Sequence, residues 1–125
     1  MFSITKEVYF CYGHRLMGHP GKCRHVHGHS VKAAITVAAP ELNGQGMVCD
    51  FAEISAVASR YIDTELDHNL LLHRDDPLVP ALAAGGERFL PLDQHPTAEY
   101  LAQLIYDEVK AKGFNVTHVT LWETA

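Results

Sequence analysis

Residues 2–14 read FSITKEVYFCYGH and residues 28–39 read GHSVKAAITVAA, and these two stretches decide the fold. Apolar and aromatic side chains fall mostly on even positions in the first stretch, and on odd positions from Val31 to Val37 in the second. A period of two predicts half-buried strands. The Gly- and Pro-rich loop over residues 16–26 is short enough for the two strands to be antiparallel neighbours.

The remaining segments extend this pair into a mixed domain. Residues 47–49 follow an Asn-Gly turn signal and predict a short third strand, and residues 115–124 predict a last one. Apolar spacings of three and four predict helices over residues 50–66 and 96–113, whereas residues 67–95 are expected to be irregular. The expected architecture is a single α+β domain over residues 1–125, with a four-stranded, mostly antiparallel sheet and two helices on one face.

Composition excludes several classes of protein. The formal net charge is -5 and the pI is about 5.9, so the basic surface of a nucleic-acid-binding protein is absent. Neither a signal peptide nor a run of the ~18 apolar residues that span a membrane is present, and we expect a cytoplasmic protein. The three cysteines cannot all pair within one chain and are expected to be free thiols, ligands or catalysts.

Histidine is the unusual component, with nine residues in the chain and a cluster near its start. His27 and His29 are two positions apart in an extended segment, so both rings point to the same face. His14 ends the preceding strand, which antiparallel pairing brings alongside. Three imidazoles leave one coordination position open, as in catalytic zinc sites. His19 and His25 are rival ligands, and His25 is the stronger rival because it shares the parity of His27.

Three further positions carry reactive groups, each with an alternative interpretation. Cys23 precedes His27 by four residues and is a candidate base or nucleophile, but also a candidate zinc ligand or a buried apolar residue. Asp67 and His68 form either an acid–base dyad or a polar cluster at a helix end. Glu123 continues an apolar strand face; its oxygens match the paired N–H edge of a flat heterocycle, or the residue lies in a frayed terminus.

The chain resembles the 6-pyruvoyl-tetrahydropterin synthase and 6-carboxytetrahydropterin synthase family over nearly its whole length. The motifs that carry the resemblance, in chain order, are Gly13-His14-Arg15-Leu16, Cys23 with His27-Gly28-His29, Gly46-Met47-Val48 with Asp50-Phe51, Leu66-Asp67-His68, Pro96-Thr97-Ala98-Glu99 and Glu123-Thr124. Each motif alone is weak, and their joint occurrence in this order is specific.

The resemblance implies the tunnelling fold, in which subunits join their sheets into a barrel and form active sites at their boundaries, commonly as a homohexamer. It implies that Cys23 is catalytic together with Asp67 and His68. The implied zinc ligands are His14, His27 and His29. The implied binding site for the pterin ring contains Thr97, Glu99 and Glu123.

The spacing Cys-x-x-x-His-Gly-His is similar to that of the bacterial branch that serves queuosine precursor synthesis. That branch converts 7,8-dihydroneopterin triphosphate to 6-carboxytetrahydropterin, with release of acetaldehyde and triphosphate. The alternatives are the 6-pyruvoyl-forming enzyme, a non-catalytic zinc- or pterin-binding protein, and a folate-pathway relative that would carry a Glu between Cys23 and His27. Tyr12 and Tyr100 depart from the residues usual in the family, which leaves the exact substrate open.

Overall fold

Strands β1 (Phe2–His14) and β2 (His27–Ala39) form the antiparallel centre of the sheet, as their alternation predicts. Their register pairs Phe2 with Ala39 at one end and His14 with His27 at the other. The computed structural model describes residues 1–124, so Ala125 of the predicted domain lies outside the described residues. No helix within residues 1–124 is both long and apolar enough to cross a membrane.

The sheet has five strands in the order β4-β3-β1-β2-β5, so the predicted four-stranded sheet is wrong in its strand count. Strand β5 (Val116–Thr124) confirms the predicted last strand and pairs with β2 antiparallel. Strands β3 (Asn69–His73) and β4 (Leu90–Leu92) add to the other edge by parallel pairing, which makes the sheet mixed.

Two segments differ from the sequence prediction. Residues 47–49 are not a strand, because the Asn43 side chain accepts hydrogen bonds from the N–H groups of Gln45 and Met47 and closes a local turn instead. Residues 67–95, expected to be irregular, contain β3, β4 and the helix α2 (Leu78–Gly85). The β3 sequence NLLLH gives no alternation, since a short strand inside a sheet is apolar on both faces.

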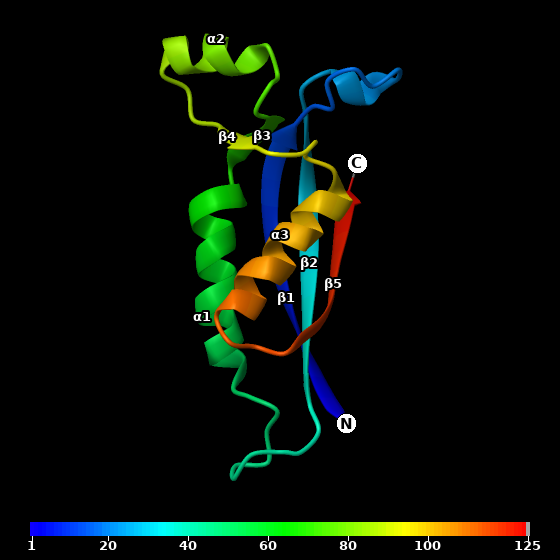
Figure 1. Ribbon diagram of the computed structural model, residues 1–125, viewed down its shortest axis with the longest axis vertical. Coiled ribbons are helices and arrows are strands. Elements are labelled where there is room, and N and C mark those ends of the chain that lie inside the picture. The colour runs from blue at the N-terminus through cyan, green and yellow to red at the C-terminus, as the bar shows by residue number, and fades with distance from the viewer. Residues whose placement is uncertain (125) are drawn as a thin grey trace.

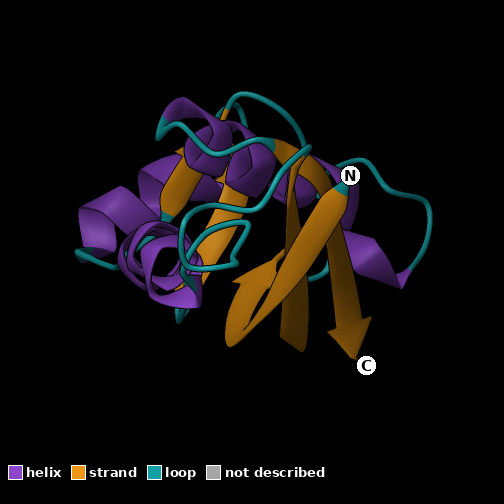
Figure 2. Ribbon diagram, turned by 90° about the horizontal axis from the view of Figure 1, so that it is seen from below, coloured by secondary structure: helices purple, strands orange, loops and turns teal. Residues whose placement is uncertain are grey.

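Helices α1 (Phe51–Tyr61) and α3 (Ala98–Ala111) cover one face of the sheet, while α2 lies beyond its end (Figures 1 and 2). Their apolar stripes pack on the inward side chains of the central strands. The largest fully buried apolar side chains of this core are Ile35, Val37, Ile54, Ile62, Leu66, Leu71, Leu101, Ile105 and Val109. The opposite face of β1 and β2 is left uncovered by these helices, so the two faces of the sheet offer different environments.

Helix α1 continues into a π-helical turn, η2 (Ile62–Leu66), which completes the helix predicted up to Leu66. The N–H of Asp67 donates to the carbonyl of Ile62 at 2.7 Å, and the chain then leaves the helix in an extended conformation. His68 follows with a φ of 53°, a left-handed conformation that is uncommon outside glycine. Such turns are frequent at functional sites, and this one places Asp67 and His68 beside β1.

Candidate active site

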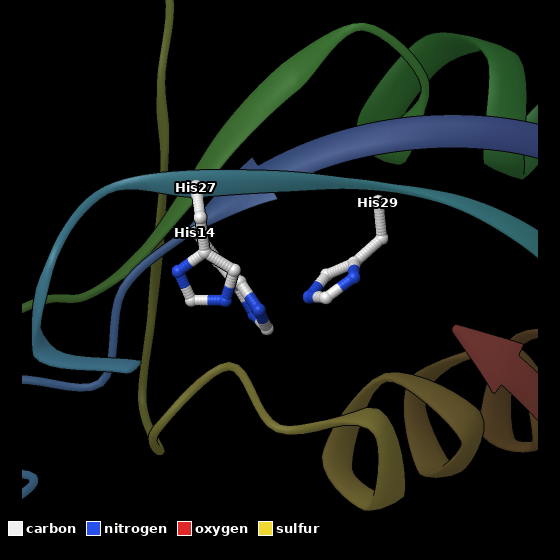
Figure 3. A group of neighbouring side chains, drawn as sticks. All are labelled: His14, His27 and His29. Carbon is white, nitrogen blue, oxygen red and sulfur yellow. The ribbon is translucent and has the colours of Figure 1, made fainter. Parts of the chain in front are cut away.

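Three imidazoles meet where β1 ends and β2 begins, on the face covered by the helices. His14 lies opposite His27 in the register, and His29 lies opposite Tyr12. The ring centroids are 4.6 Å apart for His14 and His27, 5.1 Å for His14 and His29, and 4.9 Å for His27 and His29. Figure 3 shows the rings converging from the two strands, and one nitrogen of each lies within 4.8 Å of the others.

Backbone carbonyls fix the tautomers of two of these rings. His14 Nδ1–H donates to the carbonyl of Pro96 at 2.6 Å, and His27 Nδ1–H donates to the carbonyl of His25 at 2.7 Å. Each bond leaves the Nε2 lone pair for a ligand, which is the usual arrangement around metal-bound histidines. Burial lowers the pKa of His14 although the Pro96 carbonyl opposes this shift, so the ring favours its neutral, metal-binding form. The donor set therefore fits a zinc ion.

The rival histidines belong to the loop that supports this cluster. His25 contributes its carbonyl, which holds His27, and its ring is not part of the three-residue cluster. His19 Nδ1 accepts a hydrogen bond from the N–H of Gly21 at 2.9 Å, which stabilises the turn before the one-turn 3-10 helix η1 (Lys22–Arg24). Within the described part of the chain, this cluster of converging rings contains only the three predicted histidines, His14, His27 and His29.

Tyr12 connects the imidazole cluster to Glu123. Its ring packs edge-on against His14, at a centroid distance of 5.1 Å, and against His29, at 6.0 Å. Its hydroxyl donates to Glu123 Oε1, while Glu123 Oε2 lies 3.5 Å from His29 Nε2. Burial, and then the carboxylate of Glu123, raise the pKa of Tyr12 far above its usual range, so the phenol remains a donor. Glu123 thus has a defined place at the site and does not lie in a frayed end.

A second cluster lies across β1, on the uncovered side of the sheet. Asp67 Oδ1 accepts from the N–H of Cys11 at 3.0 Å, and Asp67 Oδ2 lies 2.8 Å from His68 Nδ1. The N–H of His68 donates to the carbonyl of Cys11 at 2.7 Å. Arg88 donates to the carbonyls of Asp67 and Thr64, which fixes the turn that carries the pair. The structure thus brings Asp67 and His68 into contact at the end of η2, and their role as an acid–base dyad stays a prediction.

The charge of Asp67 is stabilised by this arrangement. Burial alone would raise the pKa of Asp67, but the N–H of Cys11, the His68 ring and the Cys11 thiol together hold it below its usual value. The carboxylate is then ionised near neutral pH and orients His68 through Nδ1. The exposed His68 ring, with 76% of its side chain accessible, is free to reach a ligand or another copy of the chain.

A hollow of about 430 Å³ lies beside this dyad. The residues that line it are Cys11, Tyr12, Gly13, Gly28, His29, Ser30 and His68. It runs along the seam between β1 and β2, where two glycines leave the strands without side chains. Its lining includes His29 of the first cluster, and Cys11 and His68 of the second.

Cys23, the predicted catalytic thiol, is half-buried in η1, within the loop between β1 and β2. Its carbonyl accepts from the N–H of Leu16 at 2.8 Å, which closes the loop. Within residues 1–124, the thiol grouped with Asp67 and His68 is that of Cys11 and not that of Cys23. Cys11 could not be predicted from the sequence, because only the parallel pairing of β1 with β3 brings it to Asp67.

The predicted pterin-binding residues Thr97 and Glu99 lie where α3 begins, next to the imidazole cluster. The Thr97 hydroxyl accepts from the N–H of Tyr100 at 3.1 Å and is the N-cap of α3. This cap fixes the segment whose Pro96 carbonyl holds His14. Glu99 is exposed, and its charge contributes to the raised pKa of Tyr12. Their proposed contact with a ligand stays a prediction.

An ion pair fastens the end of β1 to the segment after β3. Arg15 Nε donates to Asp76 Oδ2 at 2.8 Å, and a second guanidinium nitrogen donates to Oδ1. Asp76 is only 1% exposed, and the Arg15 guanidinium holds the pKa of that carboxyl below its usual range. Arg15 therefore fastens the residue after His14 to the segment that follows β3.

An α+β domain with a mixed five-stranded sheet and three convergent imidazoles defines a class of candidate metalloenzyme. Residues 3–125 match the family described as 6-pyruvoyl tetrahydropterin synthase, and the chain belongs to this family. The resemblance inferred from the motifs is thereby confirmed.

Relatives of known name cover almost the whole chain. The 6-carboxy-5,6,7,8-tetrahydropterin synthase of Rickettsia typhi is 37% identical over 99% of this chain and 95% of its own length. The protein of the same name from Aquifex aeolicus is 34% identical over 83% of this chain and 72% of its own.

Solved structures share the fold. A structure of an uncharacterized protein from Wolinella succinogenes matches with a TM-score of 0.78 and 28% identity, and the match covers 98% of this chain and 93% of that one. The 6-pyruvoyl tetrahydropterin synthase of Caenorhabditis elegans matches with a TM-score of 0.68 over 98% of this chain and 89% of that one. Its identity of 20% establishes a common fold alone.

Proposed function

We propose that the protein is a zinc-dependent lyase that converts 7,8-dihydroneopterin triphosphate and one water molecule to 6-carboxy-5,6,7,8-tetrahydropterin, acetaldehyde and triphosphate. The observation that carries the proposal is the convergence of three imidazoles, two of them held by backbone carbonyls, in a chain 37% identical to a 6-carboxytetrahydropterin synthase. In this proposal the reaction serves queuosine precursor synthesis in the cytoplasm.

His14, His27 and His29 would hold the zinc ion through nitrogens that face one another. Zinc in such a site supplies Lewis-acid polarisation of substrate oxygens and stabilises the negative charge that develops on them. The carbonyls of Pro96 and His25 keep two of the rings in the correct tautomer throughout the reaction. Glu123, held beside His29, is placed to accept hydrogen bonds from the paired N–H edge of the pterin ring.

Proton transfer is assigned to Cys23, Asp67 and His68. Cys23, as a thiolate, removes a proton from the substrate side chain, and His68, oriented by Asp67, returns one. Cys23 lies in η1 and apart from the cluster of Cys11, Asp67 and His68, so we place the complete site at a boundary between two copies of the chain. This arrangement requires an oligomer, and a homohexamer whose sheets join into a barrel is the expected one.

The second candidate is the 6-pyruvoyl-forming reaction, which eliminates triphosphate without loss of acetaldehyde. The matched family carries that name, which is the observation in its favour. Two relatives that are 37% and 35% identical over 99% of this chain carry the name of the carboxy-forming enzyme, which favours that reaction.

The test is to incubate zinc-loaded protein with 7,8-dihydroneopterin triphosphate and to identify the products by mass. Acetaldehyde together with a carboxypterin supports the first candidate, and a 6-pyruvoyl product supports the second. Substrate recovered unchanged from protein that carries one zinc per chain would show a non-catalytic binding protein. Light scattering of the same sample measures the oligomeric state, and a monomer that turns over substrate would contradict the shared site.

A further inference from the structure

The carboxylate of Glu123 is held in place by groups far away in the sequence. Its Oε1 accepts from the hydroxyl of Tyr12, 111 residues earlier, and its Oε2 lies 3.5 Å from His29 Nε2. Glu123 pairs with Val31 in the β5–β2 register, two residues beyond His29 on the same strand face. A glutamate near the end of an outer strand would otherwise sample many rotamers, because its side chain has three rotatable bonds.

Tyr12 has the shape needed to reach this carboxylate. Its side chain is anchored between the imidazoles of His14 and His29, and the residue is only 3% exposed. The ring therefore has one position, and the hydroxyl at its far end has one direction. Loss of the Tyr12 side chain would remove both this wall of the imidazole cluster and the donor to Glu123.

We propose that Tyr12 is a positioning residue that fixes the plane of the Glu123 carboxylate beside the imidazole cluster, and thereby selects flat heterocycles with two adjacent N–H donors. The choice of ligand rests on the proposed pterin chemistry, whereas the positioning itself does not. Each carboxylate oxygen has two lone pairs, so Oε1 still accepts from a ligand while it holds the Tyr12 hydroxyl. A fixed carboxylate binds such an edge more tightly because less side-chain freedom is lost on binding.

The test compares Tyr12→Phe, Glu123→Gln and the double variant with the parent protein, all loaded with zinc. The probe is neopterin, whose fluorescence quenching gives its Kd. We expect Tyr12→Phe to weaken binding roughly tenfold, Glu123→Gln to weaken it more, and the double variant to match Glu123→Gln. The matched control is Tyr9→Phe on the same strand, since Tyr9 is 72% exposed and faces the other way; its Kd is expected to be unchanged.

Kinetics separates positioning from a general structural defect. In turnover assays, Tyr12→Phe should raise KM more than it lowers kcat, because the lost interaction orients the ring of the substrate and not its reacting side chain. An unchanged neopterin Kd in Tyr12→Phe, or strictly additive effects in the double variant, would overturn the proposal.

A second readout is independent of pterin chemistry. With Co²⁺ in place of zinc, Tyr12→Phe should alter the visible absorption spectrum, because it releases the carboxylate that lies beside His29, while Tyr9→Phe should not. If the parent protein fails to bind neopterin, the proposed function loses its support, and the cobalt spectra still decide the role of Tyr12. Identical spectra for Tyr12→Phe and the parent protein would then overturn it.

Discussion

Two groups of three reactive side chains lie on opposite faces of strand β1, and they are built in different ways. The first, His14 with His27 and His29, is set by the register of adjacent strands and is held from outside by the carbonyls of Pro96 and His25. The second, Cys11 with Asp67 and His68, joins segments 56 residues apart, and its members are hydrogen-bonded to one another.

This difference indicates different chemistry for the two groups. In the first, the external bonds turn ring nitrogens toward a common point, which is preorganisation for a metal ion. In the second, Asp67 already accepts hydrogen bonds from Cys11 and lies in contact with His68 Nδ1, so its oxygens are engaged. A carboxylate that orients an exposed imidazole is suited to proton transfer at a shared boundary. All members of the first group converge within one chain. In the proposed function, the second group completes its site with another copy of the chain.

The largest expected effect is on zinc affinity, and it distinguishes the two groups. His27→Ala should lower zinc affinity more than 100-fold, since removal of a direct ligand exceeds the 10–100-fold loss typical of outer-shell changes. His68→Ala should leave zinc affinity unchanged. Metal analysis after competition with a chelator measures both. Loss of zinc in His68→Ala would show that the second group also takes part in metal binding.

The next effect is on turnover with the metal retained. Asp67→Asn should lower kcat roughly 10²–10⁴-fold, the usual contribution of an oriented acid–base group, and should keep one zinc per chain. Cys23→Ala is expected to fall in the same range, because Cys23 is the proposed thiolate. Cys11→Ala is the matched control: the N–H that donates to Asp67 remains, and a thiol is a weak donor. The kcat of Cys11→Ala is therefore expected to be unchanged. A large loss of kcat in Cys11→Ala, together with normal turnover in Cys23→Ala, would show that Cys11 is the reactive thiol.

The regular parts of the fold could be predicted from the sequence because their apolar spacings are long. Strands β1, β2 and β5 and helices α1 and α3 repeat their patterns over nine residues or more. Strands β3 and β4 have five and three residues, too few to define a period; β3 pairs with β1 and β4 pairs with β3, both in parallel. Their existence depends on tertiary contacts that no local pattern encodes.

The same limit of local patterns explains why the first group could be predicted from the sequence and the contacts of the second could not. Strand parity was sufficient to bring His14, His27 and His29 together, since they lie on neighbouring strands joined by one loop. The contact of Cys11 with Asp67 depends on the parallel pairing of β1 with β3, and the bond of Tyr12 to Glu123 joins β1 to β5 across β2. Alternation within one strand cannot predict either pairing. The sequence identified Asp67, His68 and Glu123 as reactive groups without identifying their partners.

A smaller effect tests the ion pair between Arg15, which follows His14, and Asp76, which follows β3. Asp76→Asn should lower the free energy of unfolding by about 2 kcal/mol, less than the 3–5 kcal/mol of a fully buried pair because the Arg15 side chain is 24% exposed. Asp93→Asn is the matched control, since its pair with Arg74 is largely exposed and should be worth at most about 1 kcal/mol. Urea denaturation measures both changes, and equal losses would contradict the role of Asp76.

The pH dependence of this pair has a defined sign. Because Arg15 holds the folded-state pKa of Asp76 below its unfolded value, the stabilisation is complete above that unfolded value and is lost as pH falls through the folded pKa. The difference in unfolding free energy between the parent protein and Asp76→Asn should therefore shrink on acidification from about pH 5 to about pH 2. A difference that stayed constant over this range would mean that the carboxylate charge is not what stabilises the junction.

The smallest expected effect concerns Gly13, which lies in β1 between the two groups and lines the hollow beside the dyad. An added Cβ would lie 3.4 Å from Leu70 Cδ1 and 3.5 Å from the carbonyl oxygen of His27, which are ordinary contacts. Gly13→Ala should therefore raise the free energy of unfolding by about 0.4–1 kcal/mol through reduced freedom of the unfolded chain. Gly113→Ala, at a φ of 99°, should lower it instead. Zinc content should not change in Gly13→Ala; a loss of zinc without a loss of stability would show that the two faces of β1 are coupled.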